Sequence, residues 1–438
     1  MQTLSSGRTP ASREPATLVF EPFRGVRYSA DRVSGLAEVT SPPYDVIGAA
    51  AESTLLAADA HNVVRLILPQ ADPRKPHGSY RDVGGTLASW LADEVLVPDD
   101  EPALYAYEQS DRSGAVRQRG LIGAIQLTPP GAGVVLPHED VMPGPVAGRL
   151  ELMQAAQANL EPIFLLHDGP PGATTRLLDQ TAARPPLLDV TTEDGVTHRM
   201  WAITGRADLA AIAADLAPRQ ALIADGHHRY AAYLELQARM RAAGSGPGPW
   251  DYGLALLVDS VAYPPRIDAI HRVIPGLPPA AAAAAAKQAF RVSEVDGGLD
   301  DGLSALREAG QDGTAFLVAG TGTMHLLTDP DPAKVAAAMP DGHSALWRGL
   351  SASIMQRLLL ARVWGVTDDD QNVRVIHHDA QAAVRAADET GGTAVICNPL
   401  TAPDVGAVAA RGERVPRKST SFGPKPRTGL VIRTFGTG

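Results

Sequence analysis

The chain has 438 residues, of which 45% are hydrophobic and 20% charged, and its formal net charge is −10. This composition is typical of a globular protein with two or three domains. The negative charge argues against non-specific binding of nucleic acid, which needs a basic face, although it leaves room for a local basic pocket.

The single cysteine and the distribution of apolar residues indicate where the protein works. Cys397 has no partner for an intrachain disulfide, which is compatible with a reducing cytoplasm, and its apolar surroundings favour a buried position. No apolar run reaches the ~18 residues that a transmembrane helix needs, so no membrane partner is expected. The polar N-terminus lacks the apolar core of a secretory signal and predicts a disordered tail over residues 1–16. We therefore expect a cytoplasmic protein.

The first half of the chain predicts interleaved helices and hairpins. Two prolines in SPPYDVI, residues 41–47, hold the backbone extended and present Tyr44 and Asp45 rigidly. Arg65 lies inside a predicted strand, Asn62–Pro69, where its charge must pair with a group such as Asp45 or bind substrate. The other predicted elements are helices over 80–93, 149–159 and 208–216, a strand over 162–166, and hairpins joining 103–108 to 119–127 and 187–192 to 196–204.

The second half predicts strands and helices in alternation. The strands are 221–224, 252–258, 373–377, 393–397 and 429–434, and the helices are 230–242, 277–292, 344–364 and 379–387. Together the two halves indicate an α/β (α+β) protein whose mixed sheets contain hairpins. We expect an N-terminal α/β region over residues 17–205 and a C-terminal α/β region over residues 206–438.

The stretch ADGHHRY, Ala224–Tyr230, joins a predicted strand to a predicted helix and concentrates polar groups there. Gly226 lets a ligand approach the backbone, and the free N–H groups of the following helix favour an anion. Arg229 can clamp phosphate or carboxylate. His227 and His228 can donate to phosphate or act as acid or base, and Asp225 can position a hydroxyl or hold a divalent metal.

Two other interpretations of this stretch remain. The first is a capped helix whose histidines have ordinary hydrogen-bond partners. The second is a zinc site, which is disfavoured because adjacent histidines diverge and no H-x-x-x-H or C-x-x-C spacing supplies further ligands.

The segment Arg414–Leu430 is a local basic cluster in an acidic chain. Lys418, Ser419 and Thr420 supply an ammonium and two hydroxyls suited to a phosphate chain, and Lys425 follows in the same segment. The glycine spacing of a Walker A loop is missing. A solvated basic segment is the alternative interpretation.

Weaker candidates lie elsewhere in the chain. Glu139 could be a general base, although HED, His138–Asp140, also fits a surface turn. His271 and Arg272 could line the same cleft, and Asn398 ends a strand at a position where loops contact ligands.

Taken together, these motifs resemble the bacterial and archaeal family catalogued as domain of unknown function 1015, from about Leu18 to the C-terminus. The matching pieces, in chain order, are SPPYDVI (41–47), NVVRLILP (62–69), HED (138–140), NLEPIF (159–164), ADGHHRY (224–230), AIHRVI (269–274), CNP (397–399) and KSTSFGPKPRTGL (418–430). The chain departs from its relatives over Val141–Pro145, where they carry a threonine and a lysine, and at Gly423, where they often carry an aromatic residue. These departures weaken any transfer of roles to the His138 loop and to the basic loop.

The resemblance implies phosphate chemistry. Members of the family are often labelled ParB-like, because DGHHR is similar to the phosphate-binding G-x-x-R turn of the ParB/sulfiredoxin group. Some members of that group are free-serine kinases, and genes of the family often lie beside serine-biosynthesis genes. By analogy, this implies a phosphotransfer role.

The leading hypothesis is an enzyme that binds a nucleotide or a phosphorylated metabolite and transfers a phosphoryl group to a small molecule, such as an amino-acid hydroxyl. The expected cofactors are Mg²⁺ and ATP or ADP, with Asp225 as a metal ligand. The alternatives are a phosphatase using the same pocket and a non-catalytic, ParB-like, nucleotide-dependent regulator. A second copy of the chain is a further partner to consider, whereas nucleic acid is disfavoured.

Overall fold

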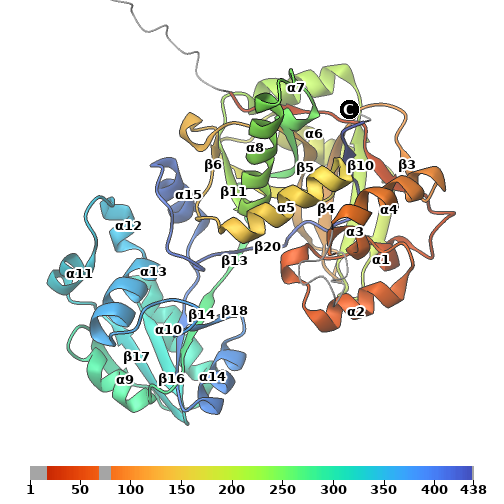
Figure 1. Ribbon diagram of the computed structural model, residues 1–438. Helices are drawn as coiled ribbons and strands as arrows, with labels where there is room; N and C mark the ends of the chain where they lie inside the picture. The colour runs from red at the N-terminus through yellow and green to blue at the C-terminus, as the bar shows by residue number, and fades with distance from the viewer. Residues whose placement is uncertain (1–16, 69–79, 437–438) are drawn as a thin grey trace, which may run out of the picture.

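The computed structural model describes residues 17–68 and 80–436, so the predicted disordered tail lies outside the described residues. Figure 1 shows two parts, which we call the first and second lobes. The first lobe is built on a nine-stranded sheet and the second on a six-stranded sheet, counted over the described residues. Strands β13 and β20 lie between the two lobes (Figure 1).

The sheet of the first lobe is mixed, with strand order β6-β11-β8-β12-β5-β4-β10-β9 and β1 paired to β5. The pairs β8/β12 and β6/β11 are parallel, and the other neighbours are antiparallel. Its strands are β1 Phe20–Glu21, β4 Leu104–Ser110, β5 Val116–Gln126, β6 Val135–Leu136, β8 Ile163–His167, β9 Leu188–Thr191, β10 Thr197–Ile203, β11 Ala221–Asp225 and β12 Tyr252–Asp259.

Local sequence explains the strongest elements of this sheet. The two predicted hairpins are present as β4/β5 and β9/β10, because each pair of apolar runs is separated by a short polar turn. All but the last residue of β11 are buried, since this strand lies inside the sheet with helices beside it. The α/β class with mixed sheets and hairpins is thus confirmed.

Helices of the first lobe include the two that border the site described below. These are α5 Pro143–Ala156, which begins with proline in its first turn, and α8 His227–Ala242, and the two helices pack against each other. The remaining elements are α1 Leu36–Val39, η1 Tyr44–Val46, α2 Ala49–Ala58, α3 Val64–Ile67, α4 Arg81–Ala92, η2 Pro130–Ala132, α6 Ala173–Ala182, α7 Arg206–Leu216 and η3 Pro249–Asp251, with small strands β2 Val26–Tyr28, β3 Leu96–Pro98, β7 Ala158–Asn159 and β21 Arg433–Thr434.

The second lobe carries the sheet β15-β17-β16-β19-β14-β18, in which all the pairs are antiparallel. Its strands are β14 Ile270–Ile274, β15 Arg291–Glu294, β16 Phe316–Gly320, β17 Thr323–Thr328, β18 Arg374–His377 and β19 Thr393–Cys397. The helices around it are α9 Pro279–Ala286, α10 Leu299–Asp312, α11 Pro332–Ala338, α12 Ala345–Gly349, α13 Ser351–Ile354, the π-helix Met355–Val363 and α14 Ala380–Glu389.

The C-terminal segment returns from the second lobe to the first. After α15, Ala402–Ala410, strand β20, Ser421–Gly423, pairs with β13, Arg266–Asp268. The chain then enters the first lobe, where β21 pairs with β7. This return places the basic segment beside β11, with which β20 is in contact.

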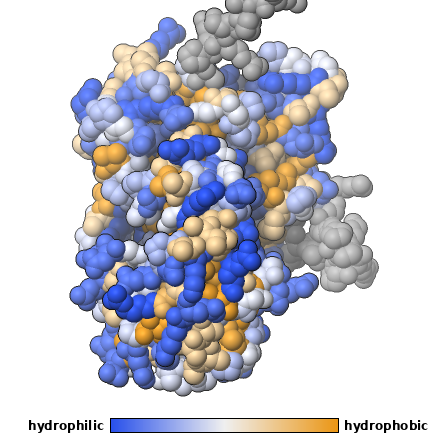
Figure 2. Space-filling view, turned by 90° about the vertical axis from the view of Figure 1, so that its left-hand side faces the viewer, coloured by the Kyte–Doolittle hydropathy of each residue, from blue (hydrophilic) through white to orange (hydrophobic). Residues whose placement is uncertain are grey.

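Apolar side chains fill the interior of both lobes, and the surface is mixed. Figure 2, which views the left-hand side of Figure 1, shows apolar residues interrupted by hydrophilic ones. Over residues 17–68 and 80–436, no helix is both long and apolar enough to cross a membrane.

The predicted strand at Asn62–Pro69 is wrong, because its described part forms helix α3. The Asn62 side chain accepts a hydrogen bond from the Val64 N–H at 2.9 Å in the turn that precedes the helix. Leu66 and Ile67 are fully buried in one apolar cluster together with Val63, which precedes the helix. A short apolar run buried on several sides carries no periodicity that separates a strand from a helix.

Other boundaries also differ from the prediction. The helical stretch predicted over 344–364 is broken at Leu350, whose backbone is extended, and continues as a π-helix. The helix predicted over 277–292 is shorter, since Arg291 already belongs to strand β15. In the predicted strand 429–434 only Arg433–Thr434 forms a named strand, with an isolated bridge at Ile432.

The strand pairing crosses the boundary between the expected regions 17–205 and 206–438. Strands β11 and β12 lie after residue 205, yet they pair with β8 and β5 of the first sheet. A boundary at residue 205 would therefore cut this sheet, and the two-region division stays a prediction.

Candidate functional site

The site is built around the turn from β11 into α8. Gly226 has φ 96°, a left-handed conformation that favours glycine. A Cβ atom there would lie 2.8 Å from Cγ2 of Ile163, so a larger residue would also clash. Glycine is thus required for the chain to pass directly from strand to helix at Asp225–His227.

The N-terminus of α8 has no side-chain cap. The first bond of the helix runs from the Tyr230 N–H to the Gly226 carbonyl at 2.9 Å. Among the described residues, the N–H groups of His227, His228 and Arg229 have no recorded acceptor. Three free donors at the positive end of a 16-residue helix favour an anion.

Lys425 joins two carboxylates from distant parts of the first lobe. Its Nζ lies 2.5 Å from Oδ1 of Asp225 and 2.5 Å from Oδ2 of Asp45. Burial opposes the charge, but the Asp225 and Asp45 carboxylates raise the pKa of Lys425. Although burial acts in the other direction, Lys425 in turn lowers the pKa of Asp45. The predicted basic segment therefore meets the predicted turn in space.

Arg229 is held by the same turn and is almost fully buried. Its Nη2 lies 2.5 Å from Oδ2 of Asp225, and its Nη1 donates to the Pro162 carbonyl at 2.6 Å. Burial opposes the charge, and the Asp225 carboxylate raises the pKa of Arg229. Its guanidinium also lies 5.9 Å from the centre of the Tyr44 ring. Arg229 thus helps to bind the loop of Tyr44 and Asp45 to the turn.

A chain of hydrogen bonds links the HED loop to the basic loop. The His138 backbone N–H donates to Nε2 of His227 at 3.2 Å. The Thr420 hydroxyl donates to Oε1 of Glu139 at 3.1 Å. Because that hydroxyl has one proton, it accepts from Nε2 of His138, which is 2.9 Å away. This order places a proton on Nε2 of His138.

The three histidines of the site are neutral near pH 7. Burial lowers the pKa of His138 to about 3 and that of His227 well below its usual value. Burial, followed by the nearby Lys418 ammonium, lowers the pKa of His228. Nε2 of His228 accepts from the Met142 N–H at 3.1 Å, so the free proton of its ring lies on Nδ1. In this arrangement His138 and His227 hold the loop against α8, and His228 keeps one N–H available.

Lys418 and Glu139 are the two charged residues of the site that are not held in an ion pair with each other or with the Asp225 turn. Lys418 is exposed, has φ 51° and has no carboxylate within ion-pair distance among the described residues. Burial raises the pKa of Glu139, while the Thr420 hydrogen bond and the Lys418 ammonium oppose this shift. An unpaired cation beside a carboxylate of raised pKa suits anion binding and proton transfer. Ser419, by contrast, is buried and donates to the Pro416 carbonyl at 2.6 Å.

The predicted metal role of Asp225 fits poorly with this geometry. The Lys425 ammonium occupies the space between the Asp225 and Asp45 carboxylates, where a divalent cation would have to lie. Within the described parts of the chain, no three His, Cys, Asp or Glu side chains form a group that could hold a metal ion. The arrangement fits an ammonium and does not fit Mg²⁺.

Four predicted site residues lie away from this turn. Arg65 is in α3, where its Nη2 donates to the Leu56 carbonyl at 2.7 Å, and the expected pair with Asp45 is absent because Asp45 binds Lys425. Asn398 donates to the Leu306 carbonyl at 2.9 Å, inside the second lobe. His271 and Arg272 are buried in β14 of the second lobe and do not line the Asp225 turn.

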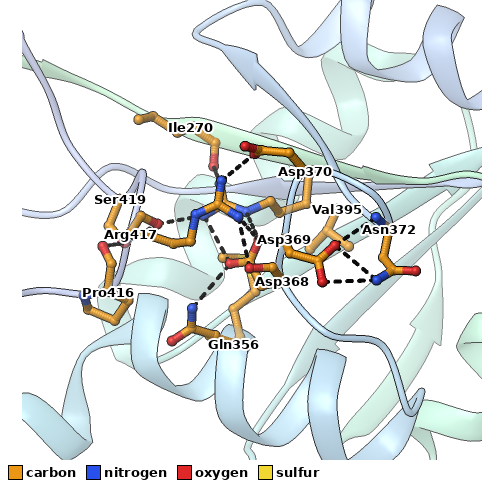
Figure 3. A network of polar contacts seen from close by, with 12 residues as sticks. Ile270, Gln356, Asp368, Asp369, Asp370, Asn372, Val395, Pro416, Arg417 and Ser419 are labelled. Carbon is orange, nitrogen blue, oxygen red and sulfur yellow. Dashed lines mark hydrogen bonds and ion pairs between the residues drawn. The ribbon is translucent and has the colours of Figure 1, made fainter. Parts of the chain in front are cut away.

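Arg272 instead belongs to a buried polar network at the edge of the second lobe. Its Nε lies 3.4 Å from Oδ1 of Asp368, and both side chains are only 1% exposed. Figure 3 shows Asp368 between Arg417 and Gln356, with Asp370 on the far side of the Arg417 guanidinium. Nη1 of Arg417 donates to the Asp368 carbonyl at 2.8 Å. This network thus reaches the residue before Lys418.

Sequence reasoning missed several residues that shape the site. Oε1 of Glu161 accepts from the Tyr44 N–H at 3.0 Å, and Oε2 of Glu161 lies 3.7 Å from Nη1 of Arg149. The Arg149 guanidinium lies 4.1 Å from the centre of the Tyr44 ring. Glu161 is a charged residue between apolar residues in the NLEPIF segment, and this pattern could have identified it. The local sequence of Asp368 contains no comparable signal.

The cavities beside these residues are small. One of about 20 Å³ is lined by Arg229 and Glu161 among others, and one of about 10 Å³ by Lys418, Ser419 and Asn398 among others. A larger cavity of about 620 Å³ lies at the other end of α8, beside Gln237 and Arg241. We place the site at the turn, because the unpaired N–H donors of α8 and Glu139, whose pKa is raised, lie there.

Comparisons with known proteins bear on the family and the fold. The family model described as "Protein of unknown function (DUF1015)" matches residues 20–353. No curated protein matches the chain.

Solved structures show only a distant likeness. A free serine kinase in complex with AMP is 15% identical, with a TM-score of 0.32, and the match covers 66% of this chain and 83% of that one. A conserved hypothetical protein from Pyrococcus furiosus is 14% identical, with a TM-score of 0.33 and coverages of 68% and 90%. SbnI from Staphylococcus aureus is 13% identical, with a TM-score of 0.35 and coverages of 70% and 87%. Likeness at this level carries no argument about activity.

Proposed function

The chain belongs to the DUF1015 family, whose function is unknown, and from this premise we propose that it is an enzyme that binds a nucleotide or a phosphorylated metabolite. The proposed reaction is phosphoryl transfer to the hydroxyl of a small molecule. One observation carries the proposal: the three free N–H groups of α8 lie in one site with the unpaired Lys418 ammonium and the Glu139 carboxylate.

In the proposed complex, the phosphate chain contacts the N-terminus of α8. The N–H groups of His227, His228 and Arg229 and the Lys418 ammonium supply the donors. Nδ1–H of His228 adds one more donor. Lys425 stays paired with its two carboxylates and holds the Asp225 turn in place.

The transfer step uses a carboxylate of this chain as the base. The acceptor hydroxyl gives its proton to Glu139 as its oxygen forms a bond to phosphorus, and the bond between that phosphorus and the departing phosphate oxygen of the nucleotide breaks. Glu139 suits this role better than Asp225, because Asp225 is engaged with both Arg229 and Lys425. Lys418 and the α8 donors would stabilise the charge on the transferred group.

Binding is the first test. Calorimetry with ATP, ADP and pyrophosphate compares wild type, Lys418→Met and the matched control Lys287→Met, whose lysine is exposed in the second lobe. We expect one or more of these ligands to bind wild type and the control equally, and Lys418→Met to bind at least ~10-fold more weakly. Equal binding by all three proteins would place the phosphate elsewhere, and no binding by wild type would overturn the proposal.

Turnover is the second test. Phosphorus NMR follows ATP or ADP with serine, homoserine or threonine as acceptor, in wild type and Glu139→Gln. A new phosphate ester indicates transfer, whereas release of inorganic phosphate without an acceptor indicates the phosphatase alternative. We expect Glu139→Gln to lower the rate by roughly 10²- to 10⁴-fold, with pyrophosphate affinity preserved. A Glu139→Gln rate equal to that of wild type would remove Glu139 as the base.

A further inference from the structure

The buried ion pair of the second lobe lies next to the loop that carries Lys418. Arg272 stands in the centre of β14, opposite Val375 of β18 and Val395 of β19. Its partner Asp368 follows the π-helix Met355–Val363. Neither side chain can reach a ligand, since each is 1% exposed.

Two hydrogen bonds connect this pair with Arg417. Nη2 of Arg272 donates to the Arg417 carbonyl at 2.9 Å, and Nη1 of Arg417 donates to the Asp368 carbonyl at 2.8 Å. Nη2 of Arg417 also bonds Oδ1 of Asp370 at 2.5 Å, as Figure 3 shows. Gln356 donates to the Asp368 carboxylate at 3.3 Å from the helix below. The main chain and the side chain of Arg417 are therefore both held by the second lobe.

The next residues of the loop are held by the first lobe. Thr420 bonds both His138 and Glu139. Between these two attachments, Lys418 adopts φ 51°, a conformation that a lysine takes only where the surrounding structure imposes it. The loop is thus anchored to one lobe on each side of Lys418.

The geometry points to Arg272 and Asp368 as positioning residues for Lys418 in the proposed phosphate site. Replacing such a pair by apolar side chains is often neutral for stability, so its presence is better explained by the conformation that it specifies. Arg272 donates one hydrogen bond to the backbone carbonyl of Arg417, and the Asp368 carboxylate holds the Arg272 guanidinium in place. This inference rests on the proposed function for the role of Lys418, although the anchoring of the loop does not depend on it.

The test measures the loop directly. Hydrogen exchange of the backbone amides of residues 417–421 is compared in wild type, in the apolar double variant Arg272→Met with Asp368→Leu, and in the control Asp215→Asn. Asp215 pairs with Arg219 at 2.9 Å in the first lobe, remote from the loop. We expect at least 10-fold faster exchange of these amides in the double variant only, with the amides of β14 and β19 still protected.

A second measurement separates positioning from a general structural role. Pyrophosphate affinity should fall at least 10-fold in the double variant, while its melting temperature stays close to that of wild type. Arg272→Lys, which keeps the charge and one donor, should restore part of the affinity. If the double variant loses protection throughout the second lobe, hydrogen exchange of residues 417–421 is measured in Arg272→Lys instead.

The outcomes distinguish the two proposals. Unchanged exchange at 417–421 in a folded variant would overturn the positioning role, whatever the protein binds. Faster exchange at 417–421 in the double variant, together with no pyrophosphate binding by wild type, would instead support the anchoring role of Arg272 and Asp368 and overturn the proposed function.

Discussion

Two charged clusters meet the C-terminal segment, and they differ in what surrounds them. Around Lys425, the Asp225 and Asp45 side chains are 12% and 34% exposed, so a ligand or water can compete for them. The Arg272–Asp368 pair is closed to solvent. Water can replace partners in a cluster that is open to solvent, so each of its ion pairs contributes little stability, whereas an ion pair closed to solvent loses much when one partner is removed.

Breaking the closed cluster should have the largest effect. Arg272→Met leaves the buried Asp368 carboxylate with the Gln356 amide at 3.3 Å and, among the described cations, only the Arg417 guanidinium at 3.8 Å. We expect the free energy of unfolding to fall by about 3 to 5 kcal/mol, because an uncompensated buried charge is costly. Urea unfolding measures the loss, and the double variant with Asp368→Leu should recover most of it. A loss below about 1 kcal/mol would show that the pair is open to solvent.

Acid should destabilise the first lobe next. His138 and His227 stay neutral when folded, since burial lowers the pKa of His138 to about 3 and that of His227 well below normal. The unfolded chain binds these protons from about pH 6.5 downward. Stability is therefore full above pH 6.5 and falls below it, by about 1.4 kcal/mol per pH unit for each histidine.

Unfolding between pH 7 and 5 measures this slope. Burial also lowers the pKa of His198 and His271 to about 4, so the wild-type slope contains their contributions. His138→Gln should give a shallower slope. An equal slope in that variant would mean that His138 is already protonated in the folded protein.

Removing the open cluster should cost less. Lys425→Met leaves Asp225 and Asp45 without their shared ammonium, although Asp225 keeps Arg229. We expect a loss of about 1 kcal/mol in the free energy of unfolding, because Lys425 is 19% exposed and water can replace it. Urea unfolding beside Lys287→Met provides the comparison. A loss as large as that of Arg272→Met would erase the distinction between the two clusters.

Lys418→Met should have the smallest effect on stability. Lys418 makes no ion pair in the described structure, so we expect a change within about 0.5 kcal/mol by urea unfolding, together with the weaker pyrophosphate binding described above. A marked loss of stability would show that Lys418 is structural.

Local patterns predicted the elements that local physics controls. The hairpins β4/β5 and β9/β10 and the turn from β11 into α8 were predicted because alternation, turn residues and a glycine before polar residues act over short distances. Helix α3 was missed because burial on several sides replaced periodicity as the deciding factor.

The candidate site was only partly predictable. The residues of the turn and of the basic segment were identified from their chemistry, and Lys425 does meet Asp225. The second-lobe residues Arg272 and Asn398 were expected at the same cleft, but Arg272 pairs with Asp368 and donates to the Arg417 carbonyl, and Asn398 donates to the Leu306 carbonyl. Residue type predicts a chemical capacity, whereas the direction in which a side chain points depends on pairing across the sheet.

By itself, the sequence determined the α/β class, the strand–glycine–helix turn at Gly226 and the two groups of polar residues that we propose bind phosphate, because each depends on neighbours along the chain. Only the tertiary structure decided that Lys425 bridges Asp225 and Asp45, that His138 and His227 are neutral, and that Lys418 makes no ion pair within the described residues. Each of these depends on burial and on partners that come from distant parts of the chain. Such partners are brought together only when the chain returns from the second lobe to the first.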